Sequence, residues 1–281
     1  MAGVAHGQIF VADFSSGSIG EYTPSGAVVN ASLITGLQRA AGLAYDGAGL
    51  LYVSEWDASS SSPGRIGVYT TSGATVNANL ITGLSSPTGL ALDGHGNLFV
   101  AEWGLNRVGE YTTSGQVINA SLIPLQNADG LALDGQGHLF VSSHDGTIGA
   151  YTTSGGVVNA SLFTGLGSPW GLAYDGNGNL FVSDVFSGKV GKYTTSGEVV
   201  NVSLITGLFS PTGVACDASG NLYVANHNVN SVDRYTTSGQ FQNSINVFSP
   251  TGIAVVPEPS PCLLVVIGVV MFAFRRVSIP E

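Results

Sequence analysis

The chain has 281 residues, of which 44% are hydrophobic and 9% are charged, and its 18 acidic and 8 basic side chains give a formal net charge of −10. A nucleic-acid-binding protein needs clustered Lys and Arg to release counterions from phosphates, and this chain has no such cluster. Its 40 glycines, together with the near absence of amphipathic helical periodicity, indicate an all-β protein. No nucleic-acid partner is expected.

A short phrase, an apolar residue followed by an aromatic residue and Val, recurs along most of the chain. Its six copies lie at residues 9–11, 51–53, 98–100, 139–141, 180–182 and 222–224. Repeats of roughly 40 residues that each carry strand residues indicate stacked copies of one small sheet. Radial stacking of such sheets produces a β-propeller.

One repeat unit, residues 168–211, shows the expected strands most clearly. Strands are predicted at residues 172–174, 180–183, about 189–193 and about 199–204. The Asp-Gly and Thr-Ser-Gly turns between them suit tight hairpins, because Asp accepts backbone hydrogen bonds and Gly tolerates positive φ. The aspartates of these turns are therefore interpreted as structural: Asp46, Asp93, Asp134, Asp175 and Asp217.

The two ends of the repeat array complete each other. The first unit has only a stunted first strand at residues 3–5, and the last opening phrase, residues 249–255, has no further strand after it. A propeller must protect its edges, and pairing the final strand with the first blade closes the ring. Residues 1–255 are thus predicted to form a six-bladed propeller of four-stranded blades, closed by the C-terminal strand. The alternative gives that place to residues 3–5 and leaves residues 253–256 as an outer or linking strand.

Residues 86–108 resemble the NHL repeat. They contain its Gly-hydrophobic-Ala-x-Asp phrase at 89–93, Gly-Asn-hydrophobic-aromatic-Val at 96–100 and Asn-Arg-hydrophobic at 106–108. The resemblance covers about residues 7–255 and implies a propeller. NHL-like propellers include scaffolds, binders of ligands and proteins, and a few lyases and lactonases, so the fold does not select the function.

The C-terminal residues 256–281 resemble a PEP-CTERM sorting signal, also known as the ice-binding protein C-terminal motif. The resemblance rests on a Pro-Glu-Pro motif, an apolar run at 262–274 and two arginines, namely Pro257, Glu258, Pro259, Arg275 and Arg276. In that family an exosortase-type membrane peptidase reads the Pro-Glu-Pro, and the protein reaches the cell surface or the exopolysaccharide. The resemblance therefore implies a sorting peptidase and the membrane as partners.

The apolar run of the tail is short for a membrane span. Its 13 residues would be about 20 Å long as a helix, against a hydrocarbon core of ~30 Å. We expect a short C-terminal helix that spans only with local thinning of the bilayer, with the arginines on the cytoplasmic side and the propeller outside. A buried strand or core helix is the alternative. An exported protein needs a signal peptide, and residues 1–10 show none, so we expect a start further upstream or a lost signal.

Aromatic and acidic residues gather on one predicted face of the propeller. The loops that join strand 2 to strand 3, and strand 4 to the next strand 1, share this face. The aromatic and imidazole side chains predicted there are Phe14, Trp56, Trp103, His144, Trp170 and His227, and the acids one position before the strand 2 to 3 loops are Asp13, Glu55, Glu102 and Asp184. Such carboxylates could bind Ca²⁺ or attract a cationic partner, and the aromatics could stack on sugars or planar ligands. Alternatively, each acid caps its own loop and each aromatic packs on the neighbouring blade.

Two functions follow from these features. The favoured one is an exported, cell-surface or exopolysaccharide-associated propeller that acts as a non-catalytic binding or scaffold protein, with an extracellular polysaccharide or protein as candidate partner. The alternative is a secreted lyase or lactonase of the streptogramin lyase or gluconolactonase-like type, although the catalytic constellations of those groups do not match this chain. Convergence of the acids and histidines on one coordination sphere would favour the enzyme, and separate loop hydrogen bonds would favour the binder.

Overall fold

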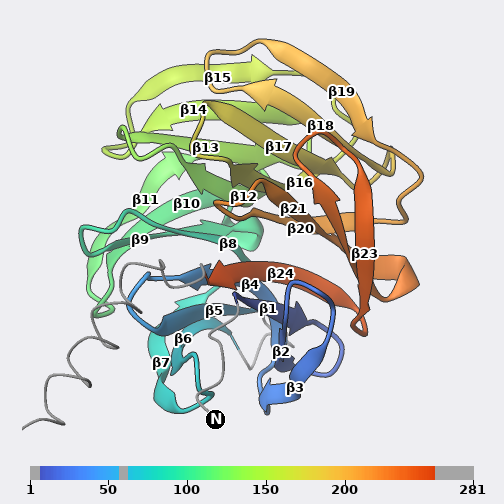
Figure 1. Ribbon diagram of the computed structural model, residues 1–281. Helices are drawn as coiled ribbons and strands as arrows, with labels where there is room; N and C mark the ends of the chain where they lie inside the picture. The colour runs from blue at the N-terminus through green and yellow to red at the C-terminus, as the bar shows by residue number, and fades with distance from the viewer. Residues whose placement is uncertain (1–6, 57–62, 257–281) are drawn as a thin grey trace, which may run out of the picture.

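Six four-stranded antiparallel sheets make up the described part of the chain in the computed structural model, which describes residues 7–56 and 63–256. The sheets are arranged as the blades of a propeller, with their first strands side by side around the centre (Figure 1). The fold is therefore the predicted all-β six-bladed propeller. Two short 3₁₀ helices, η1 (Trp103–Leu105) and η2 (His227–Val229), follow the second strands of blades 3 and 6.

Each blade is numbered here in chain order, and its strands are given from the innermost outward. They are β24 (Pro250–Val256), β1 (Gln8–Asp13), β2 (Ser18–Tyr22) and β3 (Val28–Ile34) in blade 1; β4 (Arg39–Tyr45), β5 (Leu50–Trp56), β6 (Gly64–Thr70) and β7 (Thr75–Leu84) in blade 2; β8 (Pro87–Leu92), β9 (Asn97–Glu102), β10 (Arg107–Thr112) and β11 (Val117–Pro124) in blade 3; β12 (Ala128–Leu133), β13 (His138–Ser143), β14 (Thr147–Thr152) and β15 (Val157–Phe163) in blade 4; β16 (Pro169–Tyr174), β17 (Asn179–Asp184), β18 (Lys189–Thr194) and β19 (Val199–Ile205) in blade 5; and β20 (Pro211–Cys216), β21 (Asn221–Asn226), β22 (Ser231–Thr236) and β23 (Phe241–Asn246) in blade 6.

The last strand closes the ring. β24 pairs antiparallel with β1, with Val255 opposite Ile9 and Ile253 opposite Val11. The predicted closure is confirmed, and the alternative that makes residues 253–256 an outer strand is wrong. The short strand expected at residues 3–5, the C-terminal helix and the Pro-Glu-Pro motif lie outside the described residues. No helix within the described ranges is long and apolar enough to cross a membrane.

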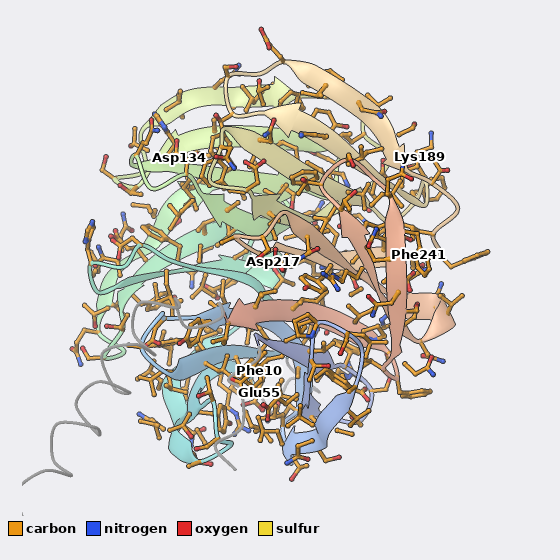
Figure 2. All side chains as sticks on the ribbon, viewed as in Figure 1. Phe10, Glu55, Asp134, Lys189, Asp217 and Phe241 are labelled. Atoms are coloured by element: carbon orange, nitrogen blue, oxygen red, sulfur yellow. The ribbon has the colours of Figure 1, made fainter. Side chains whose placement is uncertain are left out.

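The recurring phrase fills the space between blades. Its side chains are buried on both faces of the second strand, as Leu139, Phe140 and Val141 show in β13. Leu139 and Val141 pack with side chains of blade 3, and Phe140 packs with side chains of blade 5. Phe10 of β1 is buried in the same way, whereas Phe241 on the outermost strand of blade 6 lies at the surface (Figure 2).

The aspartates of the hairpin turns are structural, as predicted. Each accepts two backbone hydrogen bonds from the residues that follow it, and the pairs of donors are Ala48 and Leu50, His95 and Asn97, Gln136 and His138, Asn177 and Asn179, and Ser219 and Asn221. These bonds hold the turn between the first and second strands of blades 2 to 6. The turns lie at the opposite end of the blades from the predicted aromatic face.

A ring of six glycines, one in each innermost strand, lets neighbouring blades approach closely. A Cβ atom on Gly130 would lie 2.1 Å from the carbonyl oxygen of Trp170, and one on Gly252 would lie 2.5 Å from that of Ala41. Any side chain at these positions would force the blades apart. The remaining members make the same contact around the ring, namely Gly42, Gly89, Gly171 and Gly213.

A hydroxyl group beside each of these glycines links one blade to the next. In blade 4, Ser142 Oγ accepts a hydrogen bond from the Gly130 N–H (2.7 Å) and donates one to the Trp170 carbonyl (2.6 Å). Ser54 and Ser183 do the same in blades 2 and 5. In blades 1, 3 and 6 the second strand carries Ala at this place, and a Thr before the glycine donates to the next blade instead, namely Thr251, Thr88 and Thr212.

Candidate ligand pocket at the channel mouth

Two of the predicted acids form ion pairs within their own blades. Glu55 is buried, accepts a hydrogen bond from the Gln38 N–H (2.7 Å) and pairs with Arg65 (2.7 Å). Glu102 is also buried, accepts a hydrogen bond from the Ser85 N–H (3.1 Å) and pairs with Arg107 (2.7 Å). Both carboxylates therefore fix the loop that enters their blade and the strand beside it.

The other two acids bind the backbone of their loops. Asp13 accepts hydrogen bonds from the N–H groups of Ser15 and Ser16, and Asp184 accepts them from its own loops, from the N–H groups of Gly167, Ser168 and Ser187. Burial raises the pKa of Asp184, but these backbone donors outweigh it and the pKa lies below the ordinary value. The four acids thus act in separate loops, and among the described residues no three His, Cys, Asp or Glu side chains gather closely enough to hold a metal ion.

The aromatic face surrounds a cavity of about 340 Å³ at the mouth of the central channel. Four of the predicted side chains line it: Phe14, Trp56, Trp170 and His227. Leu and Gly residues of the innermost strands form its floor. A wider hollow lies at the other end of the channel, lined by hairpin and first-strand residues, with Asp46 as the sole acid among its described lining residues.

Aromatic rings from blades 1 to 3 touch one another along one side of this cavity. The Phe14 and Trp56 rings are 6.3 Å apart, and the Trp56 and Trp103 rings are 5.7 Å apart. The guanidinium of Arg39 lies 5.8 Å from the centre of the Phe14 ring. Further exposed apolar side chains surround the mouth in loops and in η1 and η2, namely Leu105, Phe186, Phe209, Val229 and Phe248. The face is therefore apolar well beyond the cavity itself.

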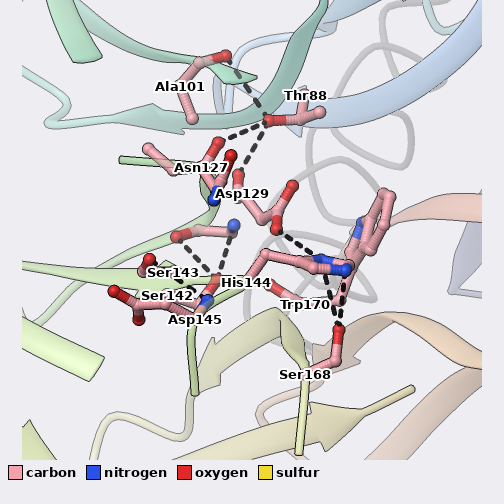
Figure 3. A network of polar contacts seen from close by, with 12 residues as sticks. Thr88, Ala101, Asn127, Asp129, Ser142, Ser143, His144, Asp145, Ser168 and Trp170 are labelled. Atoms are coloured by element: carbon pink, nitrogen blue, oxygen red, sulfur yellow. Dashed lines mark hydrogen bonds and ion pairs between the residues drawn. The ribbon is translucent and has the colours of Figure 1, made fainter. Parts of the chain in front are cut away.

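On the other side of the cavity, the side chains of His144 and Asp129 lie next to each other where blades 4 and 5 meet (Figure 3). His144 Nδ1 lies 3.4 Å from Asp129 Oδ2 and 3.1 Å from Ser168 Oγ. The His144 ring also makes an edge contact with Trp170, with ring centres 6.0 Å apart. The His144 side chain is 43% exposed, whereas the Asp129 side chain has no exposed surface.

Asp129 is the unusual member of this group. It lines the cavity, yet neither of its carboxylate oxygens has a hydrogen-bond partner among the described residues. Burial raises the pKa of Asp129 to about 8. Asp129 was not among the site residues predicted from the sequence. The signal was present, because the residue before the opening glycine is Thr in three blades and Asp only in blade 4.

Blade 6 shows what the same site looks like without the carboxylate. His227 occupies the place of His144, with Nδ1 3.1 Å from the Pro250 carbonyl oxygen and Nε2 3.4 Å from Ser249 Oγ. Thr212 stands there at the position of Asp129. The His–Ser contact is thus a feature of the repeat, and the carboxylate is specific to the junction of blades 4 and 5.

Comparison with known proteins places this fold among lyase propellers. A family model described as the Virginiamycin B lyase family matches residues 1–263. The virginiamycin B lyase of Staphylococcus aureus has a similar structure, with a TM-score of 0.64, 22% sequence identity and coverage of 90% of this chain and 89% of that one. A catalytically inactive variant of the enzyme with quinupristin has a TM-score of 0.64, 19% identity and coverage of 91% and 94%.

A propeller from a nidogen/laminin complex is also similar, with a TM-score of 0.78, 20% identity and coverage of 89% of this chain and 98% of that one. At these sequence identities the solved structures show that the fold is shared, and they show nothing about activity. No curated protein matches the chain significantly in sequence.

Proposed function

Since the chain belongs to the virginiamycin B lyase family, we propose that its channel mouth binds a small, largely apolar organic ligand and that binding is its function. The observation that carries this proposal is the cavity of about 340 Å³, which has aromatic walls and one buried carboxyl group that has no hydrogen-bond partner among the described residues. Ligand pockets are typically concave and mostly apolar, with a few polar groups that orient the ligand. A non-catalytic role is favoured because the predicted acids are engaged in separate loops.

Intrinsic fluorescence tests this proposal directly, because all three tryptophans of the chain lie on the aromatic face. Titration with quinupristin, the compound present with the similar lyase, is expected to change the tryptophan emission saturably. Trp170→Ala should weaken binding about tenfold, the scale of losing one buried aromatic contact. Tyr174→Phe, at the other end of the same strand, is the matched control and should bind normally. Equal binding by the wild type and the Trp170 variant would exclude this pocket.

A second candidate function is a lyase, and the family match and His144 favour it. A general base accepts a proton from the substrate, and an imidazole held in place by neighbouring side chains suits that role. His144 is backed by buried Asp129 and is itself partly exposed, so it could reach a substrate at the mouth.

Mass spectrometry of quinupristin incubated with the protein separates the possible activities. Ring opening by a lyase gives a product of unchanged mass and altered retention time, whereas a lactonase adds one water. His144→Ala should abolish either conversion. Binding without conversion would support the non-catalytic role, and conversion that depends on His144 would replace it with the enzyme.

For the C-terminal tail, we propose that residues 257–281 act as a sorting signal that presents the propeller at the cell surface. The order of Pro-Glu-Pro, apolar run and paired arginines supports this assignment. In a host with an exosortase-type peptidase, the full chain preceded by an added signal peptide should be shortened and reach the surface fraction. Replacement of Pro257 and Pro259 by Ala should leave the chain uncut, and unchanged processing would refute the assignment.

A further inference from the structure

We propose that Asp129 binds a positively charged nitrogen group of the ligand, a protonated amine or amidine, inside the pocket at the channel mouth. This inference rests on the binding function proposed above and assigns the chemical class of the ligand. It comes from the carboxylate that the repeat does not explain. The observations that support it are the contacts at the junction of blades 4 and 5.

The first step is that Asp129 serves no structural purpose in its blade. Ser142 already supplies the hydroxyl that links blade 4 to blade 5, so the residue before Gly130 does not need to supply one. The same holds in blade 5, where Ser183 provides the link and Trp170 stands before the glycine. Three positions before an opening glycine therefore supply no linking hydroxyl, and they carry Ala41 in blade 2, the carboxyl group of Asp129 in blade 4 and the large ring of Trp170 in blade 5, all of which line the cavity.

The second step is that Asp129 has no Lys or Arg partner among the described residues, although the imidazole of His144 lies 3.4 Å from its Oδ2. No Lys or Arg is among the described residues that line the cavity. On the described strands packed against β12, which are β8, β9, β13 and β16, the charged groups are already paired, Glu102 with Arg107 and His138 with Asp134. Ionisation of this buried carboxyl group is unfavourable, and a ligand that supplies N–H donors and positive charge would offset that cost.

The third step concerns how a ligand reaches the carboxyl group of Asp129. His144 lies over Asp129, and its ring is held by Ser168 Oγ and by the edge of Trp170, with its outer part exposed. Asp129 already lines the cavity, and rotation of the His144 side chain would expose more of its carboxyl group. Trp170 then lies beside the incoming cation, and aromatic faces attract cations. The net charge of −10 further favours a cationic ligand over an anionic one.

The proton on Asp129 provides a second readout. With a pKa of about 8, the carboxyl group of the empty pocket is mostly protonated at neutral pH. A bound ammonium group stabilises the ionised form, so binding should release a proton. His144 and His227 are the other titratable groups that face this region, and replacement of Asp129 alone distinguishes its proton from theirs.

Isothermal titration calorimetry of the full-length protein with tryptamine and tryptophol tests the inference. The two indoles have the same shape, and the first carries an ammonium group where the second carries a hydroxyl. The wild type should bind tryptamine at least about tenfold more tightly, the scale of a charged hydrogen bond. Titration at pH 7 in two buffers of different ionisation enthalpy should show release of about one proton per tryptamine.

The variants assign the effect to one group. Asp129→Asn should abolish both the preference and the proton release. Asp145→Asn, which removes an exposed carboxylate next to His144, should leave both unchanged. His144→Ala should bind tryptamine at least as tightly as the wild type, because it uncovers Asp129.

Several results would overturn the inference. They are equal affinity of the wild type for the two indoles, a preference retained by Asp129→Asn, a preference lost in His144→Ala or in Asp145→Asn, or failure to bind either indole while quinupristin binds. In each of these cases the pocket itself can still stand, as judged by Trp170→Ala. If quinupristin and both indoles fail to bind, the proposed binding function falls together with the inference.

Discussion

Six residues stand before the opening glycines of the blades, and among them only Asp129 can carry a charge; the others are Ala41, Thr88, Trp170, Thr212 and Thr251. The threonines use their hydroxyls to tie neighbouring blades together. The carboxyl group of Asp129 makes no hydrogen bond among the described residues and is fully buried. A residue that lowers the stability of the fold and has no structural role is typical of a functional site.

Replacing Asp129 by Asn should therefore stabilise the empty protein, and more so as the pH rises. The folded-state pKa of Asp129 is about 8, well above that of an unfolded aspartate, so the folded protein holds the proton more tightly. Its contribution to the free energy of unfolding consequently falls as the pH rises from about 4 to about 8, by at most ~1.4 kcal/mol per pH unit. Asn does not titrate, so the advantage of Asp129→Asn should be small at acidic pH and largest near pH 8.

Urea unfolding of the wild type and Asp129→Asn near pH 5 and near pH 8 measures this advantage. Asp184→Asn is the opposite control, because the folded-state pKa of Asp184 is lowered and its ionised form stabilises the fold above the unfolded pKa. That variant should lose stability at neutral pH. An advantage of Asp129→Asn that does not change with pH would show that Asp129 is not a buried, proton-holding carboxyl group.

At the level of elements, the linking hydroxyl moves between two strands. It comes from the second strand as Ser in blades 2, 4 and 5 and from the first strand as Thr in blades 1, 3 and 6. Either source donates to a backbone carbonyl of the next blade, although Thr251 and Thr212 bond the residue one position earlier than the serines do. The repeat therefore tolerates an exchange of residues between neighbouring strands as long as one hydroxyl remains.

This exchange predicts that a second substitution can restore stability that a first one removes. Ser142→Ala should lower the free energy of unfolding by about 1–3 kcal/mol, because the buried Gly130 N–H and Trp170 carbonyl lose their partner. Adding Asp129→Thr should recover part of that loss, because Thr can donate to a carbonyl of the next blade as in blades 1, 3 and 6, while the Gly130 N–H stays without its acceptor. A double-mutant cycle measured by urea unfolding, with Asp129→Thr alone as the third corner, gives the coupling. Additive effects would contradict the exchange.

The strands and turns could be predicted from the sequence because they depend on local chemistry. Asp-Gly turns, the buried aromatic phrase and the opening glycines each specify a conformation by themselves, and the structure has them where expected. The direction of the acids could not be predicted, because a carboxylate after a strand can point to the channel or to its own loop. The register decides it: Glu55 stands opposite Arg65, and Glu102 stands opposite Arg107.

The aromatic part of the pocket could also be predicted, because all strand 2 to 3 loops emerge on one face. Asp129 differs in the sequence from the Ala, Thr or Trp at the same position of the other blades, but that difference does not show that its carboxyl group is buried without a hydrogen bond. Its environment depends on Ser142, thirteen residues later, and on His144 and Trp170 from other segments. Only the packed structure brings these groups together, which is why the polar part of the site emerged from it alone.

At the scale of the whole molecule, the pocket and the stability of the ring depend on the same strand. β24 is the innermost strand of blade 1, and it lies between the first strands of blades 6 and 2. Thr251, Gly252 and Ile253 of this strand also line the cavity. The same strand therefore closes the ring and completes the wall of the binding site.

Removing this strand should consequently cost both folding and binding. A chain that ends at residue 249 loses the buried side chains of Ile253 and Ala254, and burial of one such apolar side chain as large as Ile is worth roughly 1.5–3 kcal/mol. It also exposes the edge of β1 and leaves blade 2 without the carbonyl contact at Gly252. Thermal unfolding followed by circular dichroism should show a much lower Tm or no cooperative transition, and the tryptophan response to quinupristin should vanish. A chain that ends at Val256 keeps β24 and should match the full-length protein in both assays, so a cooperative, ligand-binding chain ending at residue 249 would show that blade 1 closes without its C-terminal strand.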